Sequence, residues 1–252
     1  MAIGIVGAMP NEIALLSKDL KNVRHETRGM RDYHRGALYG RDITLVFSRW
    51  GKVAAASTVT TLIETFGVDS VIFTGVAGAI SSDLEIGDVV IGSDLIQHDL
   101  DASAIPGLKR FEVPLLGISA FHAKEDLVDL AKRSAERYLT VDLPCDVPRQ
   151  MLAEFGIRRP KVRAGLIVSG DQFIASAETL DGLRKSLPDA QCIEMEGAAV
   201  AQVCYEYEVP LVVARTISDK ADRSAAVDFS RFVDEIAGHF TRGIVKELIA
   251  RI

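Results

Sequence analysis

Short apolar runs alternate with segments of helical periodicity along most of the chain. Runs with the length and composition of buried strands cover residues 2–8, 33–39, 43–48, 70–74, 88–96, 162–169, 192–194 and 211–216. Apolar positions spaced three and four apart predict helices over residues 13–20, 52–66, 124–139, 149–155, 177–186, 197–207 and 229–249. This alternation predicts a single-domain α/β fold, with a mixed, largely parallel central sheet flanked by helices on both faces.

The span 98–119 interrupts the alternation. It has mixed polarity, no clear period, and turn-forming residues at Pro106, Gly107, Pro114 and Gly117. A loop of this length inside a compact domain is usually functional or faces a partner. We therefore expect one domain over residues 1–252, with a long loop near its active site.

Composition and charge narrow the class of protein. The chain has 252 residues, of which 48% are hydrophobic and 25% charged, and its net charge is −6. Such a composition is typical of a globular protein with a sizeable core. The negative charge disfavours a nucleic-acid partner, because a phosphate backbone would be repelled.

The sequence also predicts a cytoplasmic protein with no membrane partner. No window approaches the roughly 18 apolar residues of a membrane span, and no basic segment precedes the first apolar run as it does in a signal peptide. Cys145, Cys192 and Cys204 are dispersed and lack C-x-x-C spacing, which is typical of reduced thiols.

Carboxylates cluster where predicted strands give way to helices or loops. Glu194, Glu196 and Asp219 follow strand-like runs, and Glu12 follows the first strand. Ligands of open α/β sheets bind at the carboxyl ends of strands, so these acids are candidates for chemistry on a basic or hydroxyl-rich ligand. Each of them could instead cap a helix. For Glu12, helix capping and a general base remain open, because spacing alone does not distinguish them.

Other common motifs are incomplete. Gly75 and Gly78 lack the G-x-G-x-x-G spacing of dinucleotide sites, and no Walker lysine follows a glycine loop. His98, Asp99 and Asp101 lack a second group of ligands, so we expect no metal site. No G-x-S-x-G segment supports a serine hydrolase.

Six segments nevertheless form a recognisable series. In order, they are 4–12 (GIVGAMPNE), 51–56 (GKVAAA), 74–78 (TGVAG), 165–174 (GLIVSGDQFI), 194–196 (EME) and 215–219 (RTISD). Together they resemble the 5′-methylthioadenosine/S-adenosylhomocysteine nucleosidases of the purine nucleoside phosphorylase superfamily. The resemblance extends from the first predicted strand to the last predicted helix.

The resemblance implies hydrolysis of the bond between adenine N9 and ribose C1′, with a small-molecule nucleoside as substrate and no metal or cofactor. Asp219 would donate a proton or a short hydrogen bond to adenine N7. Because an aspartate with a pKa of about 3.9 is a poor donor at neutral pH, burial would have to raise it. Glu12 would orient and deprotonate the attacking water with help from Arg215.

The same resemblance implies the binding residues. Glu196 would accept hydrogen bonds from the ribose hydroxyls, Phe173 would stack on adenine, and backbone groups of Ile174 would contact the purine edge. Phe229 and the loop 98–117 would wall the pocket for the 5′ group. The remaining substrate-binding candidates are Met9, Ala77, Gly78, Glu194, Met195 and Ser218.

Some positions depart from the family pattern. Val76 stands where many relatives have a serine that helps to hold the water, and Arg49-Trp50 replaces a smaller pair. Ile105 lies where an aromatic residue is common. Trp50, Ala102 and Ile105 are therefore candidates for the 5′ pocket, which in relatives is shaped partly by the neighbouring subunit of a homodimer.

Three alternatives remain from the sequence. A phosphorylase would use phosphate instead of water, but an anion about 4 Å from Glu12 would be repelled by about 1–4 kcal/mol. A futalosine or aminofutalosine nucleosidase would accept a bulkier 5′ group. A nucleoside-binding sensor would keep the pocket without the acids.

Overall fold

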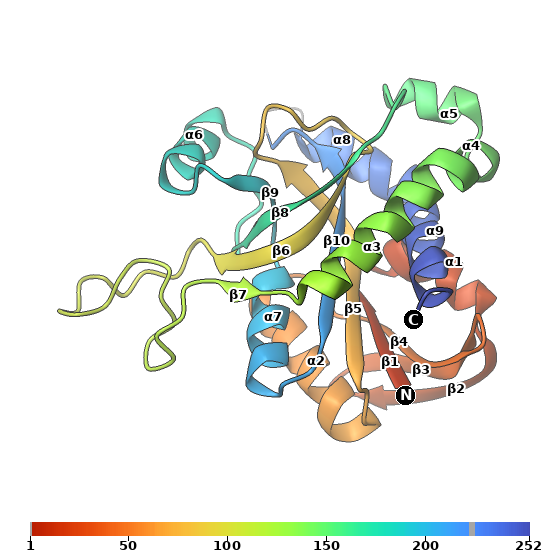
Figure 1. Cartoon of the computed structure of the whole chain (residues 1–252), viewed down its shortest axis with the longest axis horizontal. Coiled ribbons are helices and arrows are strands. Elements are labelled where there is room, and N and C mark those ends of the chain that lie inside the picture. Colours follow the sequence, from red (N-terminus) through yellow and green to blue (C-terminus); the bar gives the residue numbers. More distant parts are fainter. Residues whose placement is uncertain (1, 222–224) are drawn as a thin grey trace.

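The protein is built on a twisted mixed sheet covered by helices on both faces (Figure 1). The computed structural model describes residues 2–221 and 225–252, and for Val227 the backbone alone. The strands are β1 (Ala2–Gly7), β2 (Lys21–Arg28), β3 (Arg31–Leu38), β4 (Arg41–Phe47), β5 (Ser70–Ala79), β6 (Val89–Gln97), β7 (Phe121–His122), β8 (Val162–Ser169), β9 (Ala190–Glu194) and β10 (Leu211–Asp219).

Helices form a layer on each face of the sheet. The α-helices are α1 (Pro10–Asp19), α2 (Lys52–Phe66), α3 (Glu125–Arg137), α4 (Leu143–Asp146), α5 (Arg149–Glu154), α6 (Ala177–Ser186), α7 (Gly197–Glu206), α8 (Ala225–Phe232) and α9 (Gly238–Ile249). Short π-helical turns, η1 (Tyr138–Asp142) and η2 (Val233–Ala237), follow α3 and α8. Apolar side chains of α1, α3 and α9 fill one core, and those of α2 and α7 fill a second core across the sheet.

Part of the sheet closes on itself. The strand order is β10-β6-β8-β9-β5-β1-β4-β3-β2, and β10 also pairs with β5. Strands β5, β10, β6, β8 and β9 therefore form a ring, whereas the sequence suggested an open sheet. The sheet contains parallel pairs such as β1–β5 and β5–β10 and antiparallel pairs such as β5–β9. The closure brings the carboxyl ends of β1, β5, β9 and β10 to one place.

Most predicted elements are confirmed, and the predicted class of α/β fold is confirmed with them. The helix expected at 52–66 is α2, and it ends at Gly67 in the left-handed conformation with φ 62°. That conformation favours glycine at a helix terminus. The last predicted helix, in contrast, begins earlier, as α8, and is interrupted by η2 before α9 continues.

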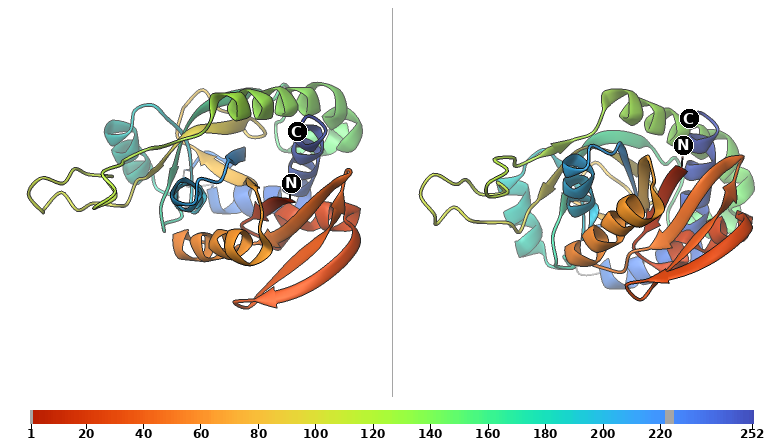
Figure 2. Two further views of the ribbon diagram at one scale, coloured as in Figure 1. Left: turned by 60° about the horizontal axis from the view of Figure 1, so that its bottom comes forward. Right: turned by 90° about the horizontal axis from the view of Figure 1, so that it is seen from below.

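Three expectations about strands were wrong. Strand β2 lies in a stretch where the sequence predicted no strand, and it pairs with β3 as an exposed edge hairpin (Figure 2). Strands β5 and β10 continue beyond their predicted ends at 74 and 216, because each pairs with the other through Asp219 and Gly78. The small residues after Thr74 therefore belong to β5.

Residues 98–120 contain none of these helices and strands. They extend from the body of the protein as a long arm between β6 and β7 (Figures 1 and 2). Within the arm, isolated bridges pair Asp101 with Arg110 and Val113 with Ile118. Across the described residues, none of the helices has the length and apolar character needed to cross a membrane.

Candidate active site

A pocket opens where the carboxyl ends of β1, β5, β9 and β10 meet. It contains about 570 Å³ of space free of protein atoms, its open mouth included. Its lining consists of Ala8, Met9, Glu12, Trp50, Val76, Ala77, Gly78, Gln172, Phe173, Ile174, Ile193, Glu194, Met195, Glu196, Ser218, Asp219 and Phe229. Four carboxylates therefore face a single pocket that is otherwise largely apolar.

Glu12 is held at the end of β1 by backbone amides. Helix α1 begins at Pro10, which places Glu12 in the first turn. Its Oε2 accepts hydrogen bonds from the N–H groups of Ala8 (2.7 Å) and Met9 (2.9 Å), and its Oε1 accepts one from Val76 (3.0 Å). Gly75 is required here, because a Cβ at that position would lie 2.5 Å from Oε1. Glu12 thus both caps a helix and lines the pocket.

Burial changes the acidity of Glu12. Its side chain is 2% exposed, and the loss of solvation raises its pKa above the ordinary value of 4.5. The positive charge of Arg215 and the three backbone N–H groups oppose that rise without cancelling it. A carboxylate with a raised pKa is a stronger base near neutral pH.

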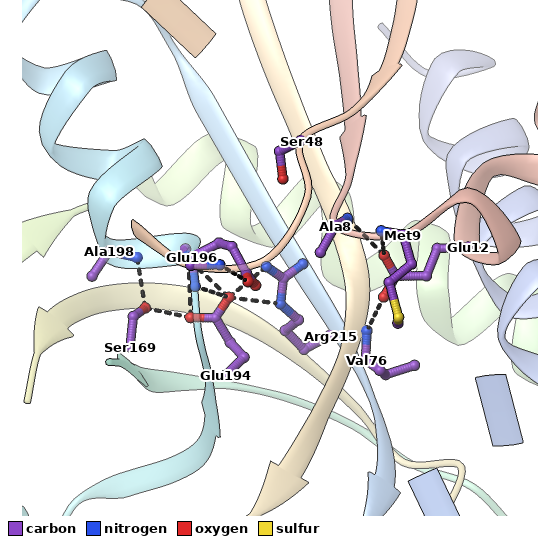
Figure 3. A network of polar contacts seen from close by, with 12 residues as sticks. Ala8, Met9, Glu12, Ser48, Val76, Ser169, Glu194, Glu196, Ala198 and Arg215 are labelled. Atoms are coloured by element: carbon purple, nitrogen blue, oxygen red, sulfur yellow. Dashed lines mark hydrogen bonds and ion pairs between the residues drawn. The ribbon is translucent and has the colours of Figure 1, made fainter. Parts of the chain in front are cut away.

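Glu194 is fixed by protein groups on every side (Figure 3). Its Oε2 accepts hydrogen bonds from Arg215 Nη2 (2.5 Å) and Nε (3.2 Å). The Gly197 N–H donates to both carboxylate oxygens, and the hydroxyl of Ser169 donates to Oε1. Since its oxygens are already satisfied in this way, Glu194 is suited to hold Arg215 and not to bind a ligand directly.

Arg215 lies behind the pocket wall. It is 1% exposed, and its guanidinium lies 4.0 Å from the centre of the Phe73 ring. Burial alone would lower its pKa, but the nearby charges of Glu194, Glu196 and Glu12 raise it. Figure 3 shows Arg215 between the two glutamates of the EME segment and Glu12. It therefore supplies a permanent positive charge to the acidic cluster.

Glu196 is buried, and no guanidinium of the described residues is bonded to it. Its Oε1 accepts a hydrogen bond from the N–H of Gly51 (2.8 Å), the residue that precedes α2. Burial and the negative charge of Glu194 raise the pKa of Glu196 to about 8. At neutral pH this carboxyl can exchange its proton readily, since its pKa lies close to the ambient pH.

Asp219 is the last residue of β10 and is 2% exposed. Its Oδ1 accepts a hydrogen bond from the N–H of Ala221, and its Oδ2 accepts one from the hydroxyl of Ser218, both at 2.8 Å. Gly78 on the paired strand leaves room for it, because a Cβ there would lie 2.9 Å from Oδ1.

Three aromatic rings form one side of the pocket. Phe173 and Phe229 meet edge to face with ring centres 5.4 Å apart, and Trp50 meets Phe229 at 6.2 Å. Trp50 and Phe173 remain 56% and 44% exposed. This surface can stack on a flat ligand near the mouth of the pocket.

The structure brings most of the predicted site residues together. Both catalytic candidates line the pocket, as do the binding candidates Met9, Trp50, Ala77, Gly78, Phe173, Ile174, Glu194, Met195, Glu196, Ser218 and Phe229. Arg215 acts from behind the lining, through Glu194. Ala102 and Ile105 are not lining residues of this pocket, since they belong to the arm.

The sequence interpretation overlooked some residues of the site. Ala8, Gln172 and Ile193 line the pocket beside residues that we did select. Ser169 was also missed, although it lies inside the fourth segment, and its Oγ accepts a hydrogen bond from the Ala198 N–H at 2.7 Å. A hydroxyl at the end of one buried strand and a glutamate at the end of another could have indicated that Ser169 and Glu194 interact.

Within 2–221 and 225–252, no three His, Cys, Asp or Glu side chains are grouped to hold a metal ion.

The closed sheet and the acidic pocket at its strand ends define the class of protein. The chain belongs to the Phosphorylase superfamily, whose sequence profile matches residues 2–250. Within that superfamily it belongs to the 5′-methylthioadenosine/S-adenosylhomocysteine nucleosidases. It is 36% identical over 240 residues to the nucleosidase of Anoxybacillus flavithermus, a match that covers 95% of this chain and 94% of that one.

Solved structures agree with this assignment. The Neisseria meningitidis nucleosidase in complex with methylthio-immucillin-A has a TM-score of 0.87 and 34% identity, with 100% of this chain and 99% of that chain covered. The futalosine hydrolase of Helicobacter pylori has a TM-score of 0.85 and 33% identity, with 100% and 98% covered. The fold therefore accommodates both kinds of hydrolase.

Proposed function

We propose that the protein is an N-glycosyl hydrolase that cleaves 5′-methylthioadenosine and S-adenosylhomocysteine. The reaction releases adenine and the corresponding 5′-thioribose. The observation that carries the proposal is that Glu12, in the first turn of α1, and Asp219, at the end of β10, are both buried and line one pocket. Relatives that bear the name of this nucleosidase match nearly the whole chain.

Cleavage first requires a better leaving group. The N9–C1′ bond breaks when adenine accepts positive charge at N7, and Asp219 is the carboxyl we assign to N7. The Ala221 N–H and the Ser218 hydroxyl donate hydrogen bonds to Asp219, and these bonds fix the direction of the carboxyl. Phe173 stacks on the adenine ring, and backbone groups of Ile174 contact its edge.

The second requirement is a nucleophile at C1′. Glu12 accepts a proton from a water molecule, which then attacks the cationic sugar from the side opposite adenine. Because Val76 has no hydroxyl to hold that water, the Glu12 carboxylate orients the water molecule. Arg215 acts as a positioning residue, because it forms an ion pair with Glu194 and because its positive charge acts on the nearby carboxylate of Glu12.

The sugar itself is held by Glu196 and by small residues. Glu196 accepts hydrogen bonds from the ribose hydroxyls, and these bonds strengthen as the ring becomes cationic. Met9 and Met195 pack against the sugar. Ala77 and Gly78 allow the backbone of β5 to approach the nucleoside closely.

A futalosine-type substrate is the second candidate. The observation that favours it is the aromatic surface of Trp50 beside Phe229, which could contact a bulkier 5′ group. A phosphorylase fits less well, because a phosphate would enter a pocket lined by the carboxylate of Glu12 and be repelled by it.

Assembly and location complete the proposal. We assign the protein to the cytoplasm as a homodimer, in which the arm at 98–119 reaches the pocket of the neighbouring subunit. Ala102 and Ile105 would then complete the 5′ pocket of the partner. Deletion of the arm's tip, followed by analytical ultracentrifugation and assay, tests this arrangement.

The decisive test is product analysis in phosphate buffer. Methylthioadenosine, adenosylhomocysteine and aminofutalosine are each incubated with the protein, and adenine and the sugar product are quantified. We expect adenine and a free 5′-thioribose from the first two substrates. A sugar 1-phosphate would support the phosphorylase instead, and faster turnover of aminofutalosine would support the second candidate.

A further inference from the structure

Three separate segments are joined beside the pocket by one small group of polar contacts. Lys52 begins α2, Asp99 lies at the root of the arm, and Asp171 follows β8. Lys52 Nζ donates to Asp99 Oδ1 at 2.6 Å, and the Asp171 N–H donates to Asp99 Oδ2 at 2.8 Å. The Lys52 N–H donates to Asp171 Oδ1 at 2.8 Å. These three contacts form a closed ring, which we call the 52–99–171 clamp.

The clamp is partly shielded from solvent. The side chains of Lys52 and Asp99 are 17% and 22% exposed, so solvent and salt screen this pair less than a fully exposed one. Burial would raise the pKa of Asp99, but Lys52 and the Asp171 N–H lower it below its ordinary value. Asp99 is therefore a charged, fixed acceptor at neutral pH.

The clamp reaches the proposed sugar site through Gly51. The N–H of Gly51 donates to Glu196 Oε1 at 2.8 Å, and the next N–H along the chain belongs to the clamp. Gly51 has φ 91°, and a Cβ on it would lie 2.9 Å from Asp171 Oδ1. A positive φ and this close approach both favour glycine. The position of the Glu196 carboxylate is thus tied to the clamp by adjacent backbone groups.

The clamp reaches the proposed adenine site through Asp171. Phe173 lies two residues further along the same loop and lines the pocket. The N–H of Asp171 is held by Asp99, and its carboxylate holds the start of α2. One carboxylate at the root of the arm therefore fixes the loop that carries Phe173 relative to the turn that holds Glu196.

We propose that Asp99 is a positioning residue, which through the 52–99–171 clamp sets the spacing between the adenine-binding loop and the ribose-binding Glu196. The inference rests on the proposed function, since it assigns Phe173 and Glu196 to the two halves of a nucleoside. It predicts that Asp99 matters for ligands that span both halves and matters little for adenine alone.

The test compares two ligands by calorimetry. One is adenine, and the other is an adenosine analogue with a carbon–carbon glycosidic bond, which a hydrolase cannot cleave. We expect Asp99→Asn to weaken binding of the analogue roughly 10-fold, in keeping with the sensitivity of positioned groups to small displacements, and to change adenine binding by less than about twofold. In the hydrolysis assay, KM should rise more than kcat falls.

Matched variants separate positioning from general damage. Lys52→Met should reproduce the effect of Asp99→Asn, and Lys52→Arg should restore part of the binding because it keeps the charge. Asp181→Asn is the control, since it removes an ion pair with Arg184 whose side chains are 61% and 42% exposed. We expect the control to bind both ligands like the wild type. Thermal unfolding of each variant confirms that it is folded. If Asp99→Asn does not fold, Lys52→Met takes its place in the comparison of the two ligands.

Each result has a distinct meaning. Equal losses for both ligands, or no loss for either, would overturn the clamp while leaving the proposed function intact. Wild-type protein that binds neither ligand and releases no adenine would overturn the proposed function and the clamp together. A selective loss of the analogue, shared by Asp99→Asn and Lys52→Met, would establish the clamp.

Discussion

Glu12 and Glu194 are both buried glutamates in the wall of one pocket, yet their surroundings differ. Glu194 is bonded directly to Arg215 and also accepts from Ser169 and the backbone. Glu12 is bonded only to the N–H groups of Ala8, Met9 and Val76 among the described residues, and Arg215 reaches it only through its charge.

The difference explains how one acidic cluster can contain both a fixed charge and a base. A carboxylate paired with a guanidinium forms charge-assisted hydrogen bonds and holds a defined geometry. A carboxylate held by neutral amides in a buried site keeps a raised pKa and can accept a proton during a reaction. The fixed charge of Glu194 therefore lies at the end of β9, whereas the carboxylate with the raised pKa, Glu12, lies in the first turn of α1.

The largest expected effect comes from removing the fixed charge. Glu194→Gln would leave Arg215 buried beside a neutral amide, and breaking a buried pair in this way costs about 3–5 kcal/mol. Glu12→Gln should cost much less, because no guanidinium within residues 2–221 and 225–252 is bonded to it. Chemical denaturation of the two variants checks this difference, and equal losses would contradict the contrast between the two glutamates.

Loss of the proposed acid should reduce activity without unfolding the protein. Asp219→Asn cannot donate a proton to adenine N7, so we expect turnover to fall at least about 100-fold, the usual scale of general acid–base catalysis. Steady-state adenine release gives the rate, and circular dichroism verifies the fold. A variant with nearly wild-type turnover would remove Asp219 from the mechanism.

Ser169 tests the support around Glu194. Ser169→Ala removes both the hydroxyl that donates to Glu194 and the acceptor for the Ala198 N–H. Buried groups left unsatisfied cost about 1–3 kcal/mol. We expect a loss of unfolding free energy in that range, with Ser169→Thr closer to the wild type. If the alanine variant is as stable as the wild type, Ser169 does not support Glu194.

Glu196 should make stability depend on pH. Because its pKa is raised from 4.5 to about 8 in the folded state, the folded protein holds a proton that the unfolded chain releases. The wild type is therefore at its full stability, as far as this group is concerned, below pH 4.5 and loses it as the pH rises through 8. Relative to the wild type, Glu196→Gln should gain at least about 2 °C in Tm between pH 5 and pH 9, which corresponds to at least roughly 0.5 kcal/mol at this chain length. A Tm difference that stays constant with pH would contradict the assignment.

The sequence predicted the elements that carry periodic apolar patterns. Helix α2 and strand β8 have the predicted bounds, because a clear period and a terminal glycine mark them. Strand β2 escaped notice because its side chains are mostly exposed on the sheet edge and follow no buried period. The ends of β5 and β10 depend on pairing between strands far apart in sequence, which no local pattern contains.

The sequence predicted which carboxylates belong to the site, but it did not predict which groups are bonded to each of them. Short segments located Glu12, Glu194, Glu196 and Asp219, and all four carboxylates line one pocket. Nothing local indicated that Glu194 would be bonded to Arg215 while Glu12 would not, since that depends on how β9 and β10 meet. The partnership of Lys52 with Asp99 depends likewise on the path of the arm.

The most direct test of the account is the pH dependence of kcat/KM for the wild type and for Glu12→Gln. A base must lose its proton to work, so the wild-type rate should rise with pH through an apparent pKa above 4.5. In Glu12→Gln we expect that rise to disappear and the rate to be at least about 100-fold lower. If the variant keeps both the rise and a rate close to that of the wild type, Glu12 does not activate the water.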